Sequence, residues 1–439
     1  MFENKNKLII FTIIFTICII TSYLIVFKDY EFALFFIIII AGTLLLLFDP
    51  IYALYGVFFT ANIYNPSIRI SFVNIYASNA LIILAFIFLI FNKLTGKKKK
   101  LLYSILDFPL ILFIIYIFSS IKIDSISIQS KRVMAYLVFA LMYFVSLNII
   151  DSREKVYKIL KIILYSSFIG SIIIIYTFYF TRFRETDLRG FGNFGNPNAA
   201  GQYLISVIPF LFYYITKRKN PIYKIIFFFI AFSLILTLSR ASIFSLMIAF
   251  IFMITLFKKN YWYFFFTLIG TIAIIFYPPV WERLISIISF KDHSLLARVT
   301  LWTDALSQFR NSPLFGIGVG NFVGSAIPYD SKSFNIAFNM FITILCENGV
   351  TGLLIYIWIW ISVFYSSFTF YFKSKDEDFI NLTFFVIISL IAINIMSIAE
   401  DPIVAIMANW VTGFNLSLIF ILRSHSDKST DNIPYISSN

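Results

Sequence analysis

The sequence predicts an all-α polytopic membrane protein with about 12 to 14 transmembrane helices. Only 13% of its 439 residues are charged and 60% are hydrophobic, whereas a soluble domain is usually about 25% charged. Apolar runs of roughly 17 to 25 residues recur along the chain, and this length crosses a hydrocarbon core of about 30 Å. The runs lack the period-two alternation of barrel strands, so the expected spans are helices.

The expected spans follow one another along the chain, and the shortest of them make the total uncertain by about two. The first run leads directly to another apolar segment and has no small-residue cleavage pattern, so we expect a retained helix rather than a signal peptide. The spans are expected at residues 8–27, 33–48, 50–63, 76–92, 104–120, 134–150, 159–180, 199–216, 222–238, 241–257, 261–277, 352–371, 379–397 and 403–422.

Lysine and arginine indicate the orientation of these spans. Basic residues concentrate before the first span and in alternate loops, at Lys5, Lys7, 93–100, 153–158, 217–219, Lys258, Lys259, 373–375 and Arg423. Short loops rich in lysine and arginine face the cytoplasm, so both termini are expected there. The net charge of +13 then reflects topology, and we expect no nucleic-acid partner.

The expected spans and their orientation divide the chain into four parts. These are N-terminal transmembrane helices at 1–180, a core at 181–360 with extracytoplasmic loops at 181–198 and 278–335, C-terminal transmembrane helices at 361–425, and a polar cytoplasmic tail at 426–439. The two cysteines, Cys18 and Cys346, lie in or beside apolar runs. They predict neither a disulfide framework nor a metal site, and we expect no cofactor.

Arginines are unexpectedly frequent on the side that the positive-inside rule leaves poor in basic residues. They are Arg182, Arg184, Arg189, Arg240, Arg283, Arg298 and Arg310. A guanidinium fork matches phosphate oxygens bidentately, so the set indicates an anionic partner. The alternatives are pairing with nearby acidic residues and contact with lipid headgroups.

The segment RGFGNFGNPNAAGQYL, residues 189–204, interrupts the apolar sequence with glycines and asparagines. Its glycines allow tight turns and close approach of the backbone to a ligand. We expect a turn at Asn196 and a helix start capped by Asn198. A helix N-terminus beside arginines suits a phosphate, so Arg184, Arg189 and both asparagines are candidate substrate-binding residues. The alternative is a simple capped loop.

A second segment, residues 297–322, predicts a helix followed by a loop rich in turns. Arg298, Trp302 and Ala305 have the spacing of one helical face. Pro313 is expected to end the helix.

The loop after this helix contains Gly316, Gly318 and Gly320, which resemble a dinucleotide fingerprint only superficially. No strand precedes them within a βαβ unit, so a Rossmann site is rejected. We expect the glycines to let the chain fold under a headgroup. Trp302, Gly318 and Asn321 are further candidate substrate-binding residues.

A third segment, residues 338–357, is apolar but contains Asn339 and Glu347, which lie two helical turns apart on one face. An ionisable residue at this depth is a functional hypothesis by default. Both residues are candidate catalytic groups, with Glu347 as base or orienter. The alternative is that Glu347 pairs with a neighbouring arginine and fixes the helix end.

Four segments together resemble the O-antigen polymerase and ligase family of bacterial surface-polysaccharide proteins. They are residues 191–204, TLSRAS at 237–242, 297–322 and 339–354, and their order and spacing match across roughly 180–360. The resemblance implies a multi-helix fold with a large extracytoplasmic loop. It also implies metal-independent glycosyl transfer from an undecaprenyl-pyrophosphate-linked glycan at the outer face of the cytoplasmic membrane.

The resemblance also implies residue roles. Arg240 lies in the Ser-Arg motif, where ligase-like members hold a functional arginine, and Arg298 matches the arginine before the Trp-containing helix. Both are therefore candidate catalytic residues that contact the pyrophosphate. Arg184 and Gly195 fit the R-x10-G pattern of polymerase loops.

One departure from the family pattern affects the expected reaction. Ligases carry a histidine before the asparagine of the third segment, where this chain has Phe338 before Asn339. The only histidines are His293 and His425. We therefore expect a repeat-unit polymerase for O-antigen or capsule, with a ligase acting on lipid A core or protein as the alternative.

Two other classes stay open, a lipid-linked glycan flippase and a headgroup-binding structural protein. Transporters usually carry charged or broken helices near mid-membrane, whereas most charge here lies at span ends. The expected partners are the lipid-linked oligosaccharide, membrane lipids, a chain-length regulator and a flippase.

Overall fold

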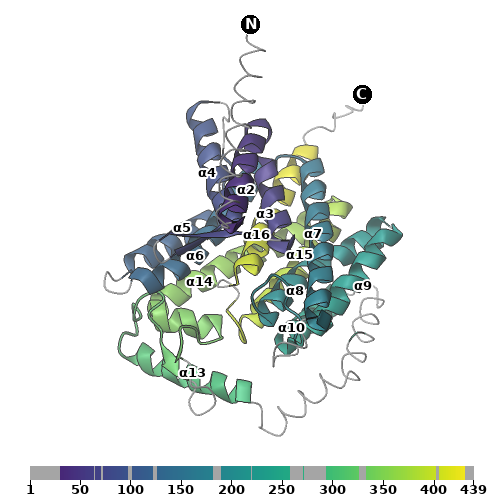
Figure 1. The fold of residues 1–439 in the computed structure, drawn as a ribbon. Helices are drawn as coiled ribbons and strands as arrows, with labels where there is room; N and C mark the ends of the chain where they lie inside the picture. The colour runs from purple at the N-terminus through teal and green to yellow at the C-terminus, as the bar shows by residue number, and fades with distance from the viewer. Residues whose placement is uncertain are drawn as a thin grey trace, which may run out of the picture. The chain divides into compact units, whose positions relative to one another are not determined.

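The computed structural model describes residues 30–63, 65–70, 73–96, 101–121, 126–180, 189–218, 220–257, 270, 293–325, 333–401 and 405–430. The described residues are almost entirely helical, which confirms the all-α class (Figure 1). The chain divides into two compact units, Met1–Leu101 and Leu102–Asn439. The expected spans at 8–27 and 261–277 lie outside the described residues, apart from Gly270.

The first unit contains three apolar helices and a hairpin. The elements are α2 (Tyr30–Phe48), α3 (Ile51–Ile63), β1 (Ser67–Ile70), β2 (Val73–Tyr76) and α4 (Ala77–Leu94). The two strands are antiparallel, with Ser67 opposite Tyr76. Helices α2 and α3 both pack on α4, because Gly42 and Gly56 leave room for the Leu81 side chain. The helices match three expected spans, whereas the hairpin was not expected.

The second unit is a larger helical bundle. Its helices are α5 (Asp107–Ser119), α6 (Ile126–Ile149), α7 (Arg153–Phe180), α8 (Pro197–Arg218), α9 (Pro221–Leu236), α10 (Arg240–Phe257), α13 (His293–Arg310), α14 (Met340–Lys373), α15 (Glu377–Met396) and α16 (Ile406–Thr430). Helix α15 packs against α8, α10 and α16, and α16 packs against α6 (Figure 1). Ser389 of α15 donates to the Ser206 carbonyl of α8 and accepts from Asn415 of α16.

Within the described residues, seven helices are long and apolar enough to cross a membrane. They are α2, α4, α6, α7, α8, α14 and α15, and shorter apolar helices accompany them at α3, α5, α9 and α10. The protein is therefore a polytopic membrane protein. The expected span at 352–371 lies in the part of α14 that follows a non-helical residue, Gly349, and a shorter helical part begins before it at Met340.

The helices of the second unit place the candidate residues that the structure describes at one end, which we call the site end. Helices α6, α8, α10, α14 and α16 begin there, and α13 packs beside α14. Two-residue strands β3 (Gly324–Ser325) and β4 (Ser333–Phe334) also pair in this region.

Basic segments meet at the opposite end of the bundle. Arg153 at the start of α7 pairs with Asp376 at the start of α15, and His425 of α16 contacts the Ile150 carbonyl. These contacts bring together the basic segments at 153–158 and 373–375.

Candidate functional site

A break in α14 shapes the site end. Gly349 has φ +64° and ψ −171°, which interrupts the helix. The carbonyls of Cys346 and Glu347 accept hydrogen bonds of 3.0 and 2.9 Å from N–H groups of the 313–318 loop. In return, the Val350 N–H donates to a carbonyl of this loop at 2.9 Å. The loop therefore replaces helical hydrogen bonds that a membrane protein must satisfy internally.

Two glycines make this close approach possible. A β-carbon at Gly316 would lie 2.3 Å from the Glu347 carbonyl carbon, and one at Gly349 would lie 2.3 Å from the Leu314 oxygen. Gly320 similarly approaches the backbone of Gln129 in α6. The described contacts thus account for the glycine-rich loop by helix packing, and Gly318 donates its N–H to Glu347.

A buried triad of charges lies beside the break and consists of Arg132, Glu347 and Asp401. Arg132 Nε lies 3.5 Å from Glu347 Oε2, and its Nη1 lies 2.9 Å from Asp401 Oδ2. The side chains are 6%, 0% and 0% exposed, respectively. Buried charges are tolerated only when they are paired, so the triad joins α6, α14 and the α15–α16 connection.

A second group, the Glu400 cluster, consists of Glu400, Arg298, Asn198 and Arg189. Arg298 Nη2 lies 2.6 Å from Glu400 Oε1, and the Asn198 amide donates to the same oxygen. Arg189 Nη2 donates to Asn198 Oδ1 at 2.7 Å, while its Nε donates to the Thr237 carbonyl at 2.9 Å. Two guanidinium groups from distant segments therefore converge through one amide and one carboxylate.

The surroundings of Glu400 alter its acidity. Burial raises the pKa of the carboxyl from 4.5 to about 7 because desolvation disfavours the charged form. The Arg298 and Arg189 guanidinium groups oppose this rise, and the neighbouring Asp401 adds to it. The Glu400 carboxyl therefore titrates near neutral pH.

Phe338 lies against this cluster in an unusual conformation. Its φ is +48°, which is rare for a bulky residue and costs about 1–3 kcal/mol. The Arg298 guanidinium carbon lies 5.6 Å from the centre of its ring. The next residue, Asn339, caps α14 by accepting from the Ile342 N–H at 3.0 Å.

The first turn of α14 is tied to the Glu400 cluster. The Met340 N–H donates to the carbonyls of Ser397 and Glu400 at 2.8 and 3.2 Å. The conformation of 338–340 is thus coupled to the α15–α16 connection.

Two expected substrate-binding side chains make internal contacts. Trp302 Nε1 donates to the Ala337 carbonyl at 2.9 Å. Asn321 accepts from Gln129 at 2.9 Å and donates to the Ile317 carbonyl at 3.0 Å. Both contacts hold the loop and α13 in place around the site.

The predicted N-cap at Asn198 is wrong. Helix α8 begins at Pro197, and the Asn196 side chain accepts from the Ala199 N–H at 2.8 Å. The cap therefore lies two residues earlier than expected. The displacement leaves Asn198 inside the first turn, where its amide bridges Arg189 and Glu400.

The structure describes the location of Arg240 but not that of Arg184. Arg240 is the first residue of α10 and is half-buried. It follows a turn in which Leu238 has φ +51° and in which Thr237 accepts from Arg189. Arg240 thus lies one turn along the chain from a contact of the Glu400 cluster, whereas Arg184 lies outside the described residues.

Sequence reasoning missed three residues of these two groups: Arg132, Glu400 and Asp401. Each is an ionisable residue next to an expected span, at 134–150, 379–397 or 403–422. The criterion applied to Glu347, an ionisable residue beside apolar sequence, would have found them.

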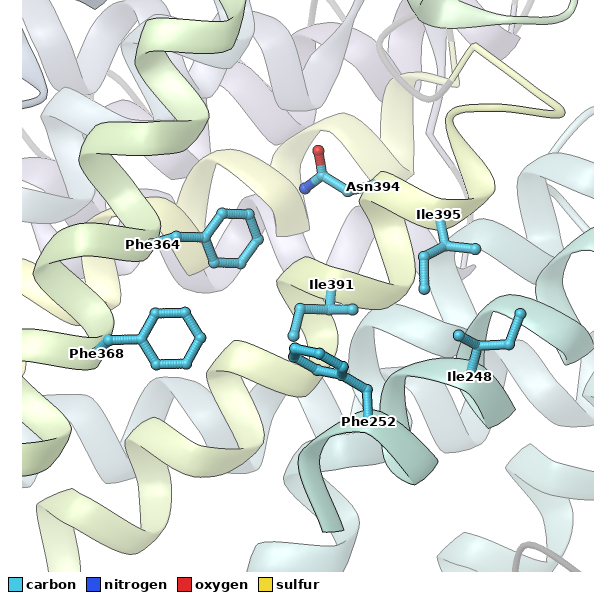
Figure 2. A pocket seen from close by; sticks show the side chains of 7 residues that line it. All are labelled: Ile248, Phe252, Phe364, Phe368, Ile391, Asn394 and Ile395. Atoms are coloured by element: carbon cyan, nitrogen blue, oxygen red, sulfur yellow. The ribbon is translucent and has the colours of Figure 1, made fainter. Parts of the chain in front are cut away.

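An apolar pocket of about 470 Å³ lies among α10, α14 and α15. Figure 2 shows the rings of Phe364, Phe368 and Phe252 around it, with Asn394 at its margin. The remaining lining residues are Ile248, Ile391 and Ile395. Asn394 donates its side-chain amide to the Leu390 carbonyl, so the pocket suits an apolar chain.

Chemically, the site end can bind an oxyanion. Its donors are the Arg189 and Arg298 guanidinium groups and the N-terminus of α8. In the part of the chain that the structure describes, no group of three or more His, Cys, Asp or Glu side chains is placed to hold a metal ion.

The comparison with protein families gives one match. Residues 225–357 match the family model described as O-antigen ligase, and no curated protein matches the chain. The matched region contains Arg240, Arg298 and Glu347, whereas Glu400 lies beyond it. The match confirms the resemblance expected from the sequence: residues 225–357 of this polytopic membrane protein are similar to the O-antigen ligase family.

Proposed function

We propose that the protein polymerises oligosaccharide repeat units of a bacterial surface polysaccharide. It transfers the growing glycan from undecaprenyl pyrophosphate to a hydroxyl at the non-reducing end of an incoming lipid-linked unit. The family match supports glycosyl transfer, and the expected product is O-antigen or capsule. The reaction takes place at the extracytoplasmic face of the cytoplasmic membrane.

The observation that carries this proposal is the convergence of Arg189 and Arg298 on Asn198 and Glu400. Donors that hold a carboxylate oxygen also suit the oxygens of a pyrophosphate. The negative charge that develops on the leaving pyrophosphate is then stabilised by groups already in position. Arg240, at the start of α10, supplies a further guanidinium at the same end.

The expected orientation is supported by the separation of charges within the second unit. The basic segments at 153–158 and 373–375 share the end opposite the Glu400 cluster. Such segments usually face the cytoplasm, and this supports an orientation with the Glu400 cluster on the extracytoplasmic side.

Phe338 favours a polymerase over a ligase. The family resemblance implies a histidine at this position in ligases, and here an apolar ring faces Arg298 instead. His425 contacts Ile150 at the opposite end. A reaction that depends on histidine before Asn339 is therefore not available to this chain.

The buried triad and the pocket have supporting roles. Arg132 fixes Glu347 and Asp401 at the base of the site. Glu347 therefore has a positioning role and does not act as the base. The pocket among α10, α14 and α15 offers apolar surface for the polyprenyl chain.

A deletion strain and arginine variants test the proposed function. Loss of a polymerase leaves a single repeat unit on the acceptor, loss of a ligase leaves carrier-linked polymer, and loss of a flippase traps units inside. Arg298→Ala and Arg240→Ala should abolish long polysaccharide while leaving the protein inserted. Normal chain-length ladders from both variants would reject the assigned roles.

A further inference from the structure

Glu400 occupies a distinctive position among the carboxylates of the site end. The α15–α16 connection carries it next to Asp401, yet the two side chains lie in different surroundings. The Glu347 and Asp401 side chains are 0% exposed and are held by Arg132. Glu400 is 7% exposed, and its partner Arg298 is 20% exposed. The Glu400 carboxylate is therefore closer to the accessible part of the site.

We propose that Glu400 is the general base that accepts the proton of the acceptor hydroxyl. This inference rests on the proposed function and assigns a residue that neither the family match nor the sequence reasoning included. Arg298 from α13 and Asn198 from α8 fix one oxygen of its carboxylate. Its backbone carbonyl accepts from Met340, so the carboxylate is anchored from three helices.

The contact with Arg298 couples donor binding to base strength. A pyrophosphate that binds Arg298 competes with Glu400 for this guanidinium group. The charges of Arg298 and Arg189 lower the pKa of Glu400, so loss of the Arg298 contact makes the carboxylate a stronger base. A base is most efficient when its pKa lies near the working pH, and burial already raises that of Glu400 to about 7.

The proposed step balances in atoms and charge. The acceptor oxygen forms a bond to the anomeric carbon of the donor sugar, and the bond from that carbon to the pyrophosphate oxygen breaks. The pyrophosphate leaves with the electron pair, and the hydroxyl proton passes to the Glu400 carboxylate. Arg298 and Arg189 hold the departing charge.

The other carboxylates fit this role less well. Glu347 is fully buried and lies 3.5 Å from Arg132, and Asp401 pairs with the same arginine. The charged groups that face Glu400 are Arg298 and Arg189, with Asp401 as its neighbour in the chain. A Glu400 variant, compared with wild type, therefore decides whether this carboxylate accepts the proton.

The test uses full-length protein in liposomes with a lipid-linked repeat unit as donor and acceptor. Elongation rates are measured from about pH 5.5 to about pH 8.5, because a general base gives a rate that rises through its pKa. Glu400→Gln keeps an oxygen for Arg298 and Asn198 but cannot accept the proton. We expect its kcat to fall by about 10²–10⁴-fold and the rise of the rate with pH to be lost. The donor KM should not increase, because the pyrophosphate no longer competes with a carboxylate for Arg298.

A matched control and a rescue separate catalysis from structure. Glu377→Gln makes the same substitution at an exposed site in the first turn of α15, at the opposite end, and should retain the wild-type profile. Formate should partly restore elongation to Glu400→Ala, because a small carboxylate can replace a missing base. A purely structural role predicts no rescue.

The outcomes distinguish the two proposals. Absence of polymer from the wild-type protein would reject the proposed function itself. A second outcome would overturn only the role of Glu400. In it, wild type elongates the glycan, the Glu400→Gln rate stays within about tenfold of the wild-type rate and still rises with pH in the same way, and formate restores nothing to Glu400→Ala.

Discussion

Replacing Arg132 by Met should strongly destabilise the protein. The substitution removes the partner of Glu347 and Asp401, whose side chains are 0% exposed. At an effective dielectric of about 20, one ion pair near 4 Å contributes about 4 kcal/mol. Removing one partner from a buried ion pair typically costs about 3–5 kcal/mol. We therefore expect the free energy of unfolding to fall by about 3–5 kcal/mol.

The measurement is reversible unfolding in mixed micelles, followed by tryptophan fluorescence. The cause can be isolated by adding Glu347→Gln and Asp401→Asn to Arg132→Met. These changes remove the unpaired charges, so the triple variant should recover much of the lost stability. A loss below about 1 kcal/mol in the single variant, with no recovery in the triple variant, would refute the reasoning, because exposed pairs contribute that little.

Three further predictions concern stability. Gly349→Ala should lower the free energy of unfolding by at least about 1–3 kcal/mol, because its φ is +64° and a β-carbon would lie 2.3 Å from the Leu314 oxygen. Gly195→Ala is the control, because Gly195 has φ +78° but open space around it, and it should lower the free energy of unfolding less. Equal losses in the two variants would contradict the packing argument. Glu400 has a folded pKa raised to about 7, so its stabilising contribution is full below about pH 4.5 and is lost as pH rises through about 7. The unfolding temperature of Glu400→Gln minus that of wild type should therefore increase from about pH 5 to about pH 8. A temperature difference that stays constant with pH would contradict the raised pKa of Glu400. Trp302→Phe removes one hydrogen bond to a backbone carbonyl and should lower the free energy of unfolding by about 0.5–1.5 kcal/mol. A loss of elongation without a loss of stability would instead indicate that Trp302 contacts the substrate.

The helices could be predicted from the sequence because hydrocarbon thickness constrains their length. Expected spans such as 159–180 and 379–397 correspond to α7 and α15. The helix face of Arg298 and Trp302 was also predicted, since helical spacing alone determines which residues share a face. Both residues do contact the site end.

The tertiary pairings could not be predicted in the same way. Arg132 and Asp401 are distant in the chain, and no local pattern specifies that they meet. The cap at Asn196 was missed because the sequence offers two asparagines around Pro197, and either could precede a helix. The break at Gly349 depends on a loop that lies more than 30 residues earlier in the chain, so periodicity carries no signal for it.

The central claim is that Arg189 and Arg298 bind a diphosphate at the site end. The most direct measurement is the affinity of the protein in liposomes for a short-chain polyprenyl pyrophosphate, compared with the matching polyprenol. We predict that wild type binds the pyrophosphate more tightly than the polyprenol. Arg298→Ala should weaken the affinity for the pyrophosphate about 10-fold or more, since hydrogen bonds to charged groups contribute about 1.5–3 kcal/mol. Equal affinities for pyrophosphate and polyprenol, or an unchanged affinity in Arg298→Ala, would contradict the account.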